Sequence, residues 1–182
     1  MNRAQLEHLI RAASAICGER DLIILGSQAI LGQFPDAPRT LRVSAEADLY
    51  PRDRPDLADL IDGAIGELSM FHDRFGYYAQ GVGPNTAILP AGWQARLVPI
   101  CGLETQGATG WCLEIHDLLL SKYVPFREKD EAYILEAIRL RLVRRSKLLA
   151  LVPTMPIGAD QQARITAQIC RHFRLPRSSM KA

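Results

Sequence analysis

Short apolar runs typical of buried strands alternate with stretches of helical periodicity along the first two thirds of this chain. Residues 21–26 (DLIILG) form one such run, whereas residues 4–17 place apolar side chains three and four positions apart. Beyond residue 116 mainly helical periodicity remains. This order predicts an α/β (α+β) fold, in which a small mixed sheet is flanked by helices and followed by a helical C-terminal part.

The same patterns give a set of expected elements and three expected regions. Strands are expected at 21–26, 41–51, 76–82, 94–100 and 111–115. Helices are expected at 4–17, 26–34, 56–68, 116–124, 127–143 and 159–173. We expect an α/β core over residues 1–113, a helical region over 114–175 packed on that core, and a flexible basic tail over 176–182.

Composition excludes several classes of protein. No run approaches the about 20 consecutive apolar residues that a membrane span requires, and the first residues lack the pattern of a signal peptide. The four cysteines stand singly, without a histidine at metal-ligand spacing, and are interpreted as small buried side chains. We therefore expect a soluble, cytoplasmic protein without a disulfide framework.

Charge is unevenly distributed along the chain. Residues 1–91 carry 8 Lys and Arg against 12 Asp and Glu, whereas residues 92–182 carry 14 against 8. An acidic first half suits a cation-binding site, and a basic second half suits contact with polyanions. A solvated helix face rich in arginine explains the basic part equally well.

Two short motifs about twenty residues apart point to a specific chemistry. Gly26 and Ser27 follow the first apolar run, where backbone N–H groups and a hydroxyl at the start of a helix would suit a phosphate. Glu46 and Asp48 stand two positions apart in the next expected strand, so their side chains point to one face. A divalent cation such as Mg²⁺ would relieve the repulsion between them. Together the motifs would supply a phosphate-binding turn and a metal-binding pair of carboxylates, the minimum that metal-assisted phosphoryl transfer requires.

Each motif also has an ordinary structural explanation. Gly-Ser pairs are common in turns, and a Glu-x-Asp pair on one strand face can simply lie in water. A purely structural domain with two accidental motifs therefore remains an alternative. The order and spacing of the motifs on adjacent elements favour a functional site.

The stretches IILGSQAILGQF and SAEADLYP resemble the opening of the minimal nucleotidyltransferase fold of the polymerase-beta-like superfamily. The chain is similar to uncharacterised bacterial proteins that neighbour the abortive-infection nucleotidyltransferase toxins. HDLLLSKYVPFREKDEAYI also resembles those members, and the likeness spans roughly residues 22–135. The resemblance implies a nucleoside triphosphate as substrate, Mg²⁺ or Mn²⁺ as cofactor, and a role in a toxin–antitoxin or phage-defence pair with a cognate antitoxin.

The resemblance also implies roles for individual residues. Phosphate would be held by Gly26 and Ser27, while the catalytic metal ligands would be Glu46 and Asp48. In the second half of the chain, the residues that would contact the nucleotide or shape the cleft around it are Lys122, Arg127, Lys129 and Asp130.

An aromatic stretch leads into the third expected strand. Its rings and its histidine can stack on a nucleotide base or hydrogen-bond to it; they are Phe71, His72, Phe75, Tyr77 and Tyr78. His72 is the candidate nucleotide-binding residue, with an ordinary surface position as the alternative. Phe71 and Phe75 are expected in the core.

The sequence departs from the superfamily pattern in two places. The first acid is Glu46 where most members have Asp. A third acid, which activates the attacking hydroxyl, is expected on a following strand, but residues 94–100 contain Arg96 and no carboxylate. Glu67 and Glu104 lie near expected strands without matching the position that the pattern requires.

Two functions therefore remain open. The first is a Mg-dependent nucleotidyltransferase that moves a nucleotidyl group from a nucleoside triphosphate to an RNA or protein hydroxyl. The second is a catalytically degenerate module that binds nucleotide, RNA or a partner protein. If RNA is the substrate, its phosphates are expected to contact Arg139, Arg141, Arg144, Arg145 and Lys147.

Overall fold

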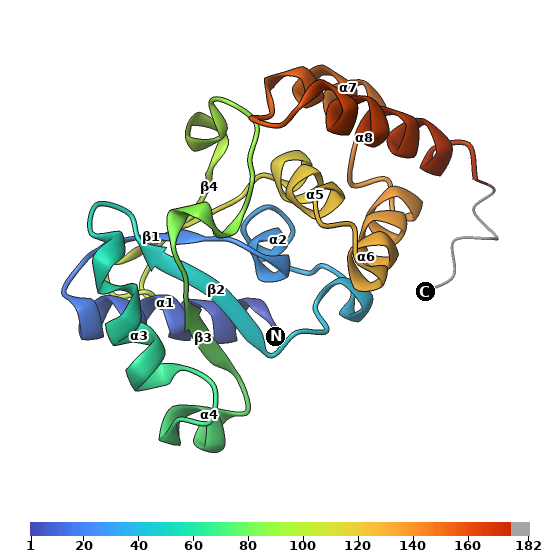
Figure 1. Cartoon of the computed structure of the whole chain (residues 1–182). Coiled ribbons are helices and arrows are strands. Elements are labelled where there is room, and N and C mark those ends of the chain that lie inside the picture. The colour runs from blue at the N-terminus through green and yellow to red at the C-terminus, as the bar shows by residue number, and fades with distance from the viewer. Residues whose placement is uncertain (176–182) are drawn as a thin grey trace. The chain divides into compact units, whose positions relative to one another are not determined.

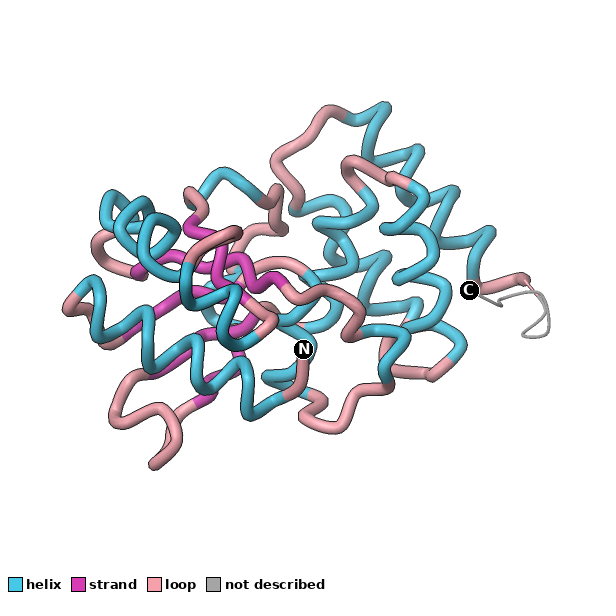
Figure 2. Tube along the Cα trace, turned by 90° about the horizontal axis from the view of Figure 1, so that it is seen from below, coloured by secondary structure: helices cyan, strands magenta, loops and turns pink. Residues whose placement is uncertain are grey.

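A computed structural model describes residues 1–175 as two compact units. Unit 1 comprises Met1–Ala87 and Arg96–Glu114, and unit 2 comprises Ile88–Ala95 and the chain from Ile115 onward. In the described chain the five strands belong to unit 1, and unit 2 is helical (Figures 1 and 2). The predicted α/β class with a helical C-terminal part is confirmed. The expected basic tail at 176–182 lies outside the described residues.

The elements of each unit follow the chain in order. Unit 1 contains α1 (Arg3–Cys17), β1 (Asp21–Ile24), α2 (Ile30–Gln33), β2 (Glu46–Pro51), α3 (Ala58–Ile65), α4 (Met70–Phe75), β3 (Tyr78–Gly81), β4 (Val98–Ile100) and β5 (Thr109–Cys112). Unit 2 contains α5 (Ile115–Tyr123), α6 (Glu128–Arg139), α7 (Arg145–Leu151) and α8 (Ala159–His172). None of these helices combines the length and hydropathy that a membrane span needs.

The sheet of unit 1 has the strand order β3-β2-β1-β5-β4. β1 runs antiparallel to β2 and parallel to β5, β2 runs parallel to β3, and β4 runs antiparallel to β5. The sheet is therefore mixed, as predicted. Leu22 and Ile24 of the central strand β1 are fully buried, because apolar β-branched and leucine side chains fit a strand covered on both faces. β2 lies next to β1 and carries the two acids.

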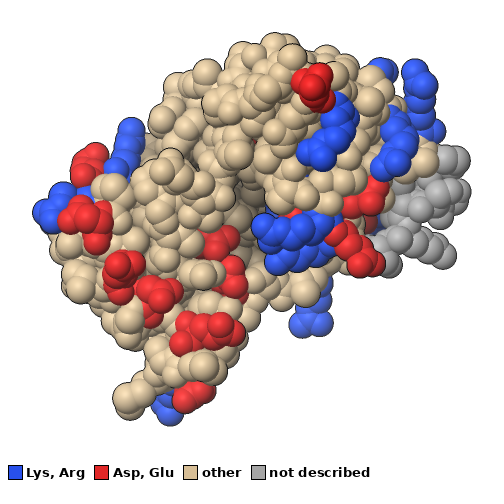
Figure 3. Space-filling view, in the orientation of Figure 1, with Lys and Arg blue, Asp and Glu red and all other residues tan. Residues whose placement is uncertain are grey.

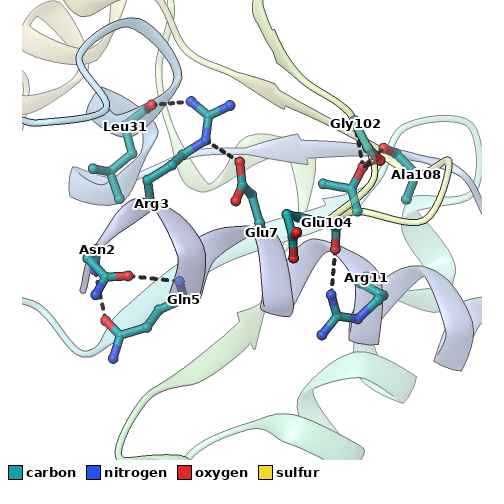
Figure 4. A network of polar contacts seen from close by, with 10 residues as sticks. Asn2, Arg3, Gln5, Glu7, Arg11, Leu31, Gly102, Glu104 and Ala108 are labelled. Carbon is teal, nitrogen blue, oxygen red and sulfur yellow. Dashed lines mark hydrogen bonds and ion pairs between the residues drawn. The ribbon is translucent and has the colours of Figure 1, made fainter.

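Local sequence signals explain α1, which covers the sheet. Asn2 and Gln5 form a reciprocal capping box that satisfies backbone N–H groups at the start of the helix. Arg3 donates to Glu7 one turn along and to the Leu31 carbonyl, which fastens α1 to α2 (Figure 4). Gly18 ends the helix with a φ of 75°. The buried side of α1 is formed by Leu6, Leu9, Ile10 and Ala13.

The strand that carries the two acids is shorter than predicted. The pattern at 41–51 predicts one strand, but β2 begins at Glu46, and Val43 is 83% exposed. Backbone pairing explains the difference, because β3 reaches β2 only from the Glu46–Tyr78 register onward. Alternating polarity alone does not make a strand where no neighbouring strand accepts its hydrogen bonds.

Other elements are also shorter than their sequence patterns predict. The helix expected at 26–34 is a 3₁₀ turn, Ser27–Ala29, followed by the four residues of α2. The strand expected at 94–100 is reduced to β4, because Trp93–Arg96 forms a 3₁₀ turn. The helix expected at 127–143 ends at Arg139, and Arg141 turns the chain with a φ of 58°.

The core of unit 2 contains a buried histidine. His172 of α8 has no exposed surface; its Nδ1 lies 3.1 Å from the Tyr123 hydroxyl and its Nε2 lies 3.1 Å from Glu131 Oε1. Arg171 also donates to Glu131, and the ring of Phe126 stacks on the His172 ring. Burial lowers the pKa of His172, and the hydrogen bond that Glu131 accepts from the ring opposes that effect.

We expect the stability of the protein to decrease as the pH falls through about 6.5, the ordinary histidine pKa. The unfolded chain then binds a proton that folded His172 resists, so the free energy of unfolding drops. Replacing His172 with phenylalanine should cost about 1–3 kcal/mol at pH 8, because the Tyr123 hydroxyl loses its partner. Urea unfolding at several pH values should show this difference shrinking towards pH 5. A difference independent of pH would contradict this role.

Candidate functional site

The two acids lie on the less buried face of β2. Ala47 and Leu49 point into the core and are 1% and 0% exposed, whereas Glu46 and Asp48, which alternate with them, are half-buried. Residues two apart on a strand share a face, so the carboxylates stand side by side as their spacing predicts. This places two acceptor groups on one surface of the sheet.

Gly26 brings backbone close to Asp48. The Leu25 amide donates to the Asp48 carbonyl over 2.9 Å, which ties the end of β1 to β2. Gly26 then adopts φ 60° and ψ −169°, a conformation that is essentially restricted to glycine. A Cβ atom at this position would lie 1.9 Å from Asp48 Oδ2. Only glycine therefore lets the carboxylate lie against this turn, and the two sequence motifs meet here in unit 1.

Strand β3 supplies two more side chains to the same face of the sheet. In the parallel register Tyr78 stands opposite Glu46, and Gln80 stands opposite Asp48. The Tyr78 hydroxyl donates to Glu46 Oε2 over 3.1 Å. Burial, the hydrogen bond to Glu46 and the charges of Glu46, Glu67 and Asp48 raise the pKa of Tyr78 to about 12. Tyr78 is therefore a protonated hydrogen-bond donor at neutral pH.

His72 lies behind Tyr78. The centres of the two rings are 4.6 Å apart, and His72 Nδ1 accepts a hydrogen bond of 3.1 Å from the Leu68 amide. Its own backbone amide is capped by Ser69 Oγ at the start of α4. The structure thus brings His72 to the residue that contacts Glu46.

The neighbouring phenylalanines are not core residues, which corrects the prediction for them. Phe75 is 45% exposed and Phe71 is half-buried. Both pack on His8 of α1, whose Nδ1 lies 2.7 Å from the Tyr77 hydroxyl. Helix α4 is too short to bury both rings against the sheet, so they form an aromatic cluster at the surface.

Acidic side chains gather around this part of unit 1. On the face shown in Figure 3, red Asp and Glu atoms concentrate over the region of α3, α4 and β3. The exposed acids of this segment are Asp56, Asp59, Asp62, Glu67 and Asp73. Such a distribution makes the local potential negative and attracts cations.

The donor set fits a Mg²⁺ ion that also takes ligands from a bound phosphate chain. Within residues 1–175 no three His, Cys, Asp or Glu side chains group as metal ligands, so unit 1 has no cage made of protein atoms alone. Mg²⁺ is commonly held by one or two carboxylates together with substrate phosphates and water. Glu46 and Asp48 provide that number of carboxylates.

The strand expected to carry a third acid is not the neighbour of the acid pair. β4 lies at one edge of the sheet, separated from β2 by β1 and β5, and contains only Val98, Pro99 and Ile100. The neighbour of β2 is β3, whose sequence is Tyr-Ala-Gln-Gly. The position opposite Asp48 is therefore occupied by the amide of Gln80, and β3 supplies no carboxylate to this face.

Three of the four nucleotide-site residues predicted in the second half, Lys122, Arg127 and Asp130, come together in unit 2. Lys122 lies in the last turn of α5, and its ammonium lies 3.5 Å from Asp130 Oδ1 and 4.7 Å from the centre of the Tyr133 ring. Arg127 precedes α6, and its amide donates to Asp130 Oδ2, so Asp130 caps the helix as well as pairing with Lys122. Lys129 is exposed. A contribution of these four residues to nucleotide binding stays a prediction.

The basic stretch from Arg139 to Lys147 is not one helix face. Arg139 forms two hydrogen bonds of 2.6 and 2.7 Å with Glu136. Arg141 and Arg144 lie in the turn between α6 and α7, and Arg145 begins α7. Arg141, Arg144 and Arg145 are exposed, and Lys147 is half-buried. The exposed arginines of this stretch therefore lie in or next to a turn, and their contact with RNA stays a prediction.

The sequence did not lead us to expect Tyr78 and Gln80 beside Glu46 and Asp48 on the same face of the sheet. Both residues lie in the expected strand at 76–82 and are two positions apart, as Glu46 and Asp48 are. A spacing of two residues is the period of a strand, so it could have indicated that the side chains of each pair lie on one face. The strand order and register, which set Tyr78 opposite Glu46, could not be obtained from periodicity.

Comparisons with known proteins identify the family. Residues 4–174 match the family described as "Nucleotidyltransferase of unknown function (DUF6036)". No curated protein and no solved structure shows a significant match. The matched range includes the Gly26–Ser27 turn, the acid pair of β2 and the described helices of unit 2. The family name indicates a nucleotide as substrate, and the chain belongs to this family of nucleotidyltransferases.

Proposed function

We propose that unit 1 binds a nucleoside triphosphate together with Mg²⁺, or Mn²⁺, and transfers its nucleotidyl group to an RNA or protein hydroxyl. The observation that carries this proposal is the contact between the two motifs. Glu46 and Asp48 share one face of β2, and the Gly26 turn lies directly against Asp48. A phosphate chain above this turn could share a cation with both carboxylates.

The reaction requires one bond to form and one to break. The acceptor hydroxyl oxygen attacks the α-phosphorus, the bond to the β-phosphate oxygen breaks, pyrophosphate leaves, and the hydroxyl proton passes to a base or to water. A bound Mg²⁺ ion supplies neutralisation of the charge on the phosphate oxygens. Glu46 and Asp48 would hold the ion at one place, and Gly26 would let the phosphate chain approach the backbone of the turn closely.

An RNA acceptor is the macromolecular substrate that the charge distribution favours. The exposed arginines at the turn between α6 and α7, Arg141, Arg144 and Arg145, provide positive charge for phosphate contacts without sequence preference. A toxin–antitoxin or phage-defence role is supported by the resemblance in sequence alone.

One observation favours a second candidate function, which is nucleotide binding without transfer. Gln80 stands opposite Asp48 on β3, where an acid could accept the proton of the attacking hydroxyl. An amide cannot act as that base. A chain with the metal-binding pair but no base would bind a nucleotide and turn it over slowly through positioning and electrostatics.

Label transfer distinguishes the two functions. The full chain is incubated with total cellular RNA and protein, Mg²⁺, and each of the four nucleoside triphosphates labelled at the α-phosphate. We expect radioactivity to appear in RNA or in protein with at least one nucleotide, and to fall to background when EDTA removes the metal. Electrophoresis after nuclease or protease digestion identifies the acceptor.

Binding is measured in parallel by equilibrium dialysis with the same labelled nucleotides. Retention of a nucleotide without transfer to any acceptor would support the binding module and overturn the transferase. Neither retention nor transfer with any of the four nucleotides would contradict both functions. Transfer that persists unchanged in EDTA would show that the reaction does not require the proposed metal ion.

A further inference from the structure

We propose that Tyr78 is a positioning residue that fixes the carboxylate of Glu46 for metal binding, with His72 holding the tyrosine ring in place. This inference rests on the proposed function, because it assigns a role to the carboxylate that the function uses. It adds Tyr78 to the site and gives His72 a structural task in place of direct nucleotide contact.

The length of the Glu46 side chain explains why its carboxylate needs a supporting hydrogen bond. A glutamate side chain has one more rotatable bond than an aspartate, so its carboxylate samples more positions. Tyr78 counters this freedom from the neighbouring strand, where the register places it opposite Glu46. Its hydroxyl donates to Oε2 over 3.1 Å, which leaves Oε1 to face a cation. Such supporting hydrogen bonds orient metal ligands and are commonly needed for full metal affinity.

The tyrosine ring is itself held from behind. His72 packs on it with ring centres 4.6 Å apart. The Leu68 amide donates to His72 Nδ1, and Leu68 adopts a φ of 61°, which is uncommon for a side chain of its size. The turn before α4 is thus shaped to aim an amide at His72, and a chain of contacts runs from Leu68 through His72 and Tyr78 to Glu46.

Tyr77 provides a matched control on the adjacent residue. Its hydroxyl lies 2.7 Å from His8 Nδ1 and makes no contact with Glu46. Tyr77 and Tyr78 are similarly buried, at 8% and 9% exposed. Replacing either with phenylalanine removes one hydroxyl and one hydrogen bond, so the loss of stability should be similar, about 1 kcal/mol.

The experiment measures Mn²⁺ binding by electron paramagnetic resonance in the presence of inorganic tripolyphosphate. This probe supplies the phosphate ligands common to all nucleoside triphosphates without a base. We expect Tyr78→Phe to weaken Mn²⁺ binding about tenfold and Tyr77→Phe to leave it within about twofold of wild type. In a Glu46→Gln background, Tyr78→Phe should cause little further loss, because the hydroxyl acts through Glu46. Melting temperatures of all variants establish that they are folded.

The outcomes separate this inference from the proposed function. If Glu46→Gln weakens Mn²⁺ binding and Tyr78→Phe does not, the positioning role is wrong and the metal site stands. If Tyr78→Phe weakens binding equally in both backgrounds, the tyrosine does not act through Glu46. If wild type binds no Mn²⁺, or Glu46→Gln has no effect, the proposed site itself is wrong and the role of Tyr78 falls with it.

Discussion

Replacing Asp48 with asparagine should lower nucleotidyl transfer by roughly 10²- to 10³-fold without unfolding the protein. A metal ion at a reacting phosphate contributes several kcal/mol of charge stabilisation, and each 1.36 kcal/mol corresponds to a factor of ten in rate. Asparagine keeps the size of the side chain and removes the charge that Mg²⁺ requires. Label transfer and Mn²⁺–tripolyphosphate binding measured on the same variant should fall together.

The Asp48→Asn variant should stay folded in the absence of metal. Glu46 and Asp48 are like charges on one strand face, and removing one of them relieves their repulsion. Functional sites commonly lower stability in this way. A thermal melt without metal measures the change. A large drop in melting temperature would show that Asp48 is structural and would contradict its assignment as a metal ligand.

Asp53→Asn is the matched control for charge. Asp53 is exposed and lies two residues beyond the end of β2, so its replacement removes one negative charge from the same region. A general electrostatic attraction for cations would be weakened similarly by both substitutions. Ligation by Asp48 predicts that Asp53→Asn retains transfer within about twofold of wild type.

The sequence predicts α1 and β1 of unit 1 because each has a regular burial pattern, along one side of α1 and on both faces of β1. The apolar run at 21–26 contains the central strand β1, and the pattern at 4–17 corresponds to α1. Prediction failed where tertiary contacts decide where an element ends. β2 starts at Glu46 because β3 pairs with it from that residue onward, and no local pattern contains that information.

The positions of the two acids in the candidate site could be predicted from the sequence, whereas the residues that surround them could not. Two carboxylates two positions apart on a strand must share a face, so the placement of Glu46 and Asp48 follows from spacing. The third-acid position depends on which strand lies beside β2. In the sheet, β3 is the neighbour of β2, and β1 and β5 separate β2 from β4. Residues 94–100 therefore could not supply the third acid.

Replacing Gly26 with alanine should weaken Mn²⁺–tripolyphosphate binding by about 100-fold or more and also lower stability. The new Cβ would lie 1.9 Å from Asp48 Oδ2, and the carboxylate must rotate away to relieve the clash. Backbone strain at φ 60° and ψ −169° adds a cost of about 1–3 kcal/mol in the free energy of unfolding. Metal titration and urea unfolding of the same variant measure the two effects.

Gly18→Ala separates backbone strain from displacement of the carboxylate. Gly18 ends α1 with a φ of 75°, and a Cβ there would have no atom within 4 Å. Alanine at this position carries a left-handed strain of about 1–2 kcal/mol and leaves Asp48 untouched. Both variants should therefore lose stability through backbone strain, and only Gly26→Ala should lose metal affinity. Equal Mn²⁺ affinity in both variants would mean that the Gly26 turn and the acid pair do not form one site.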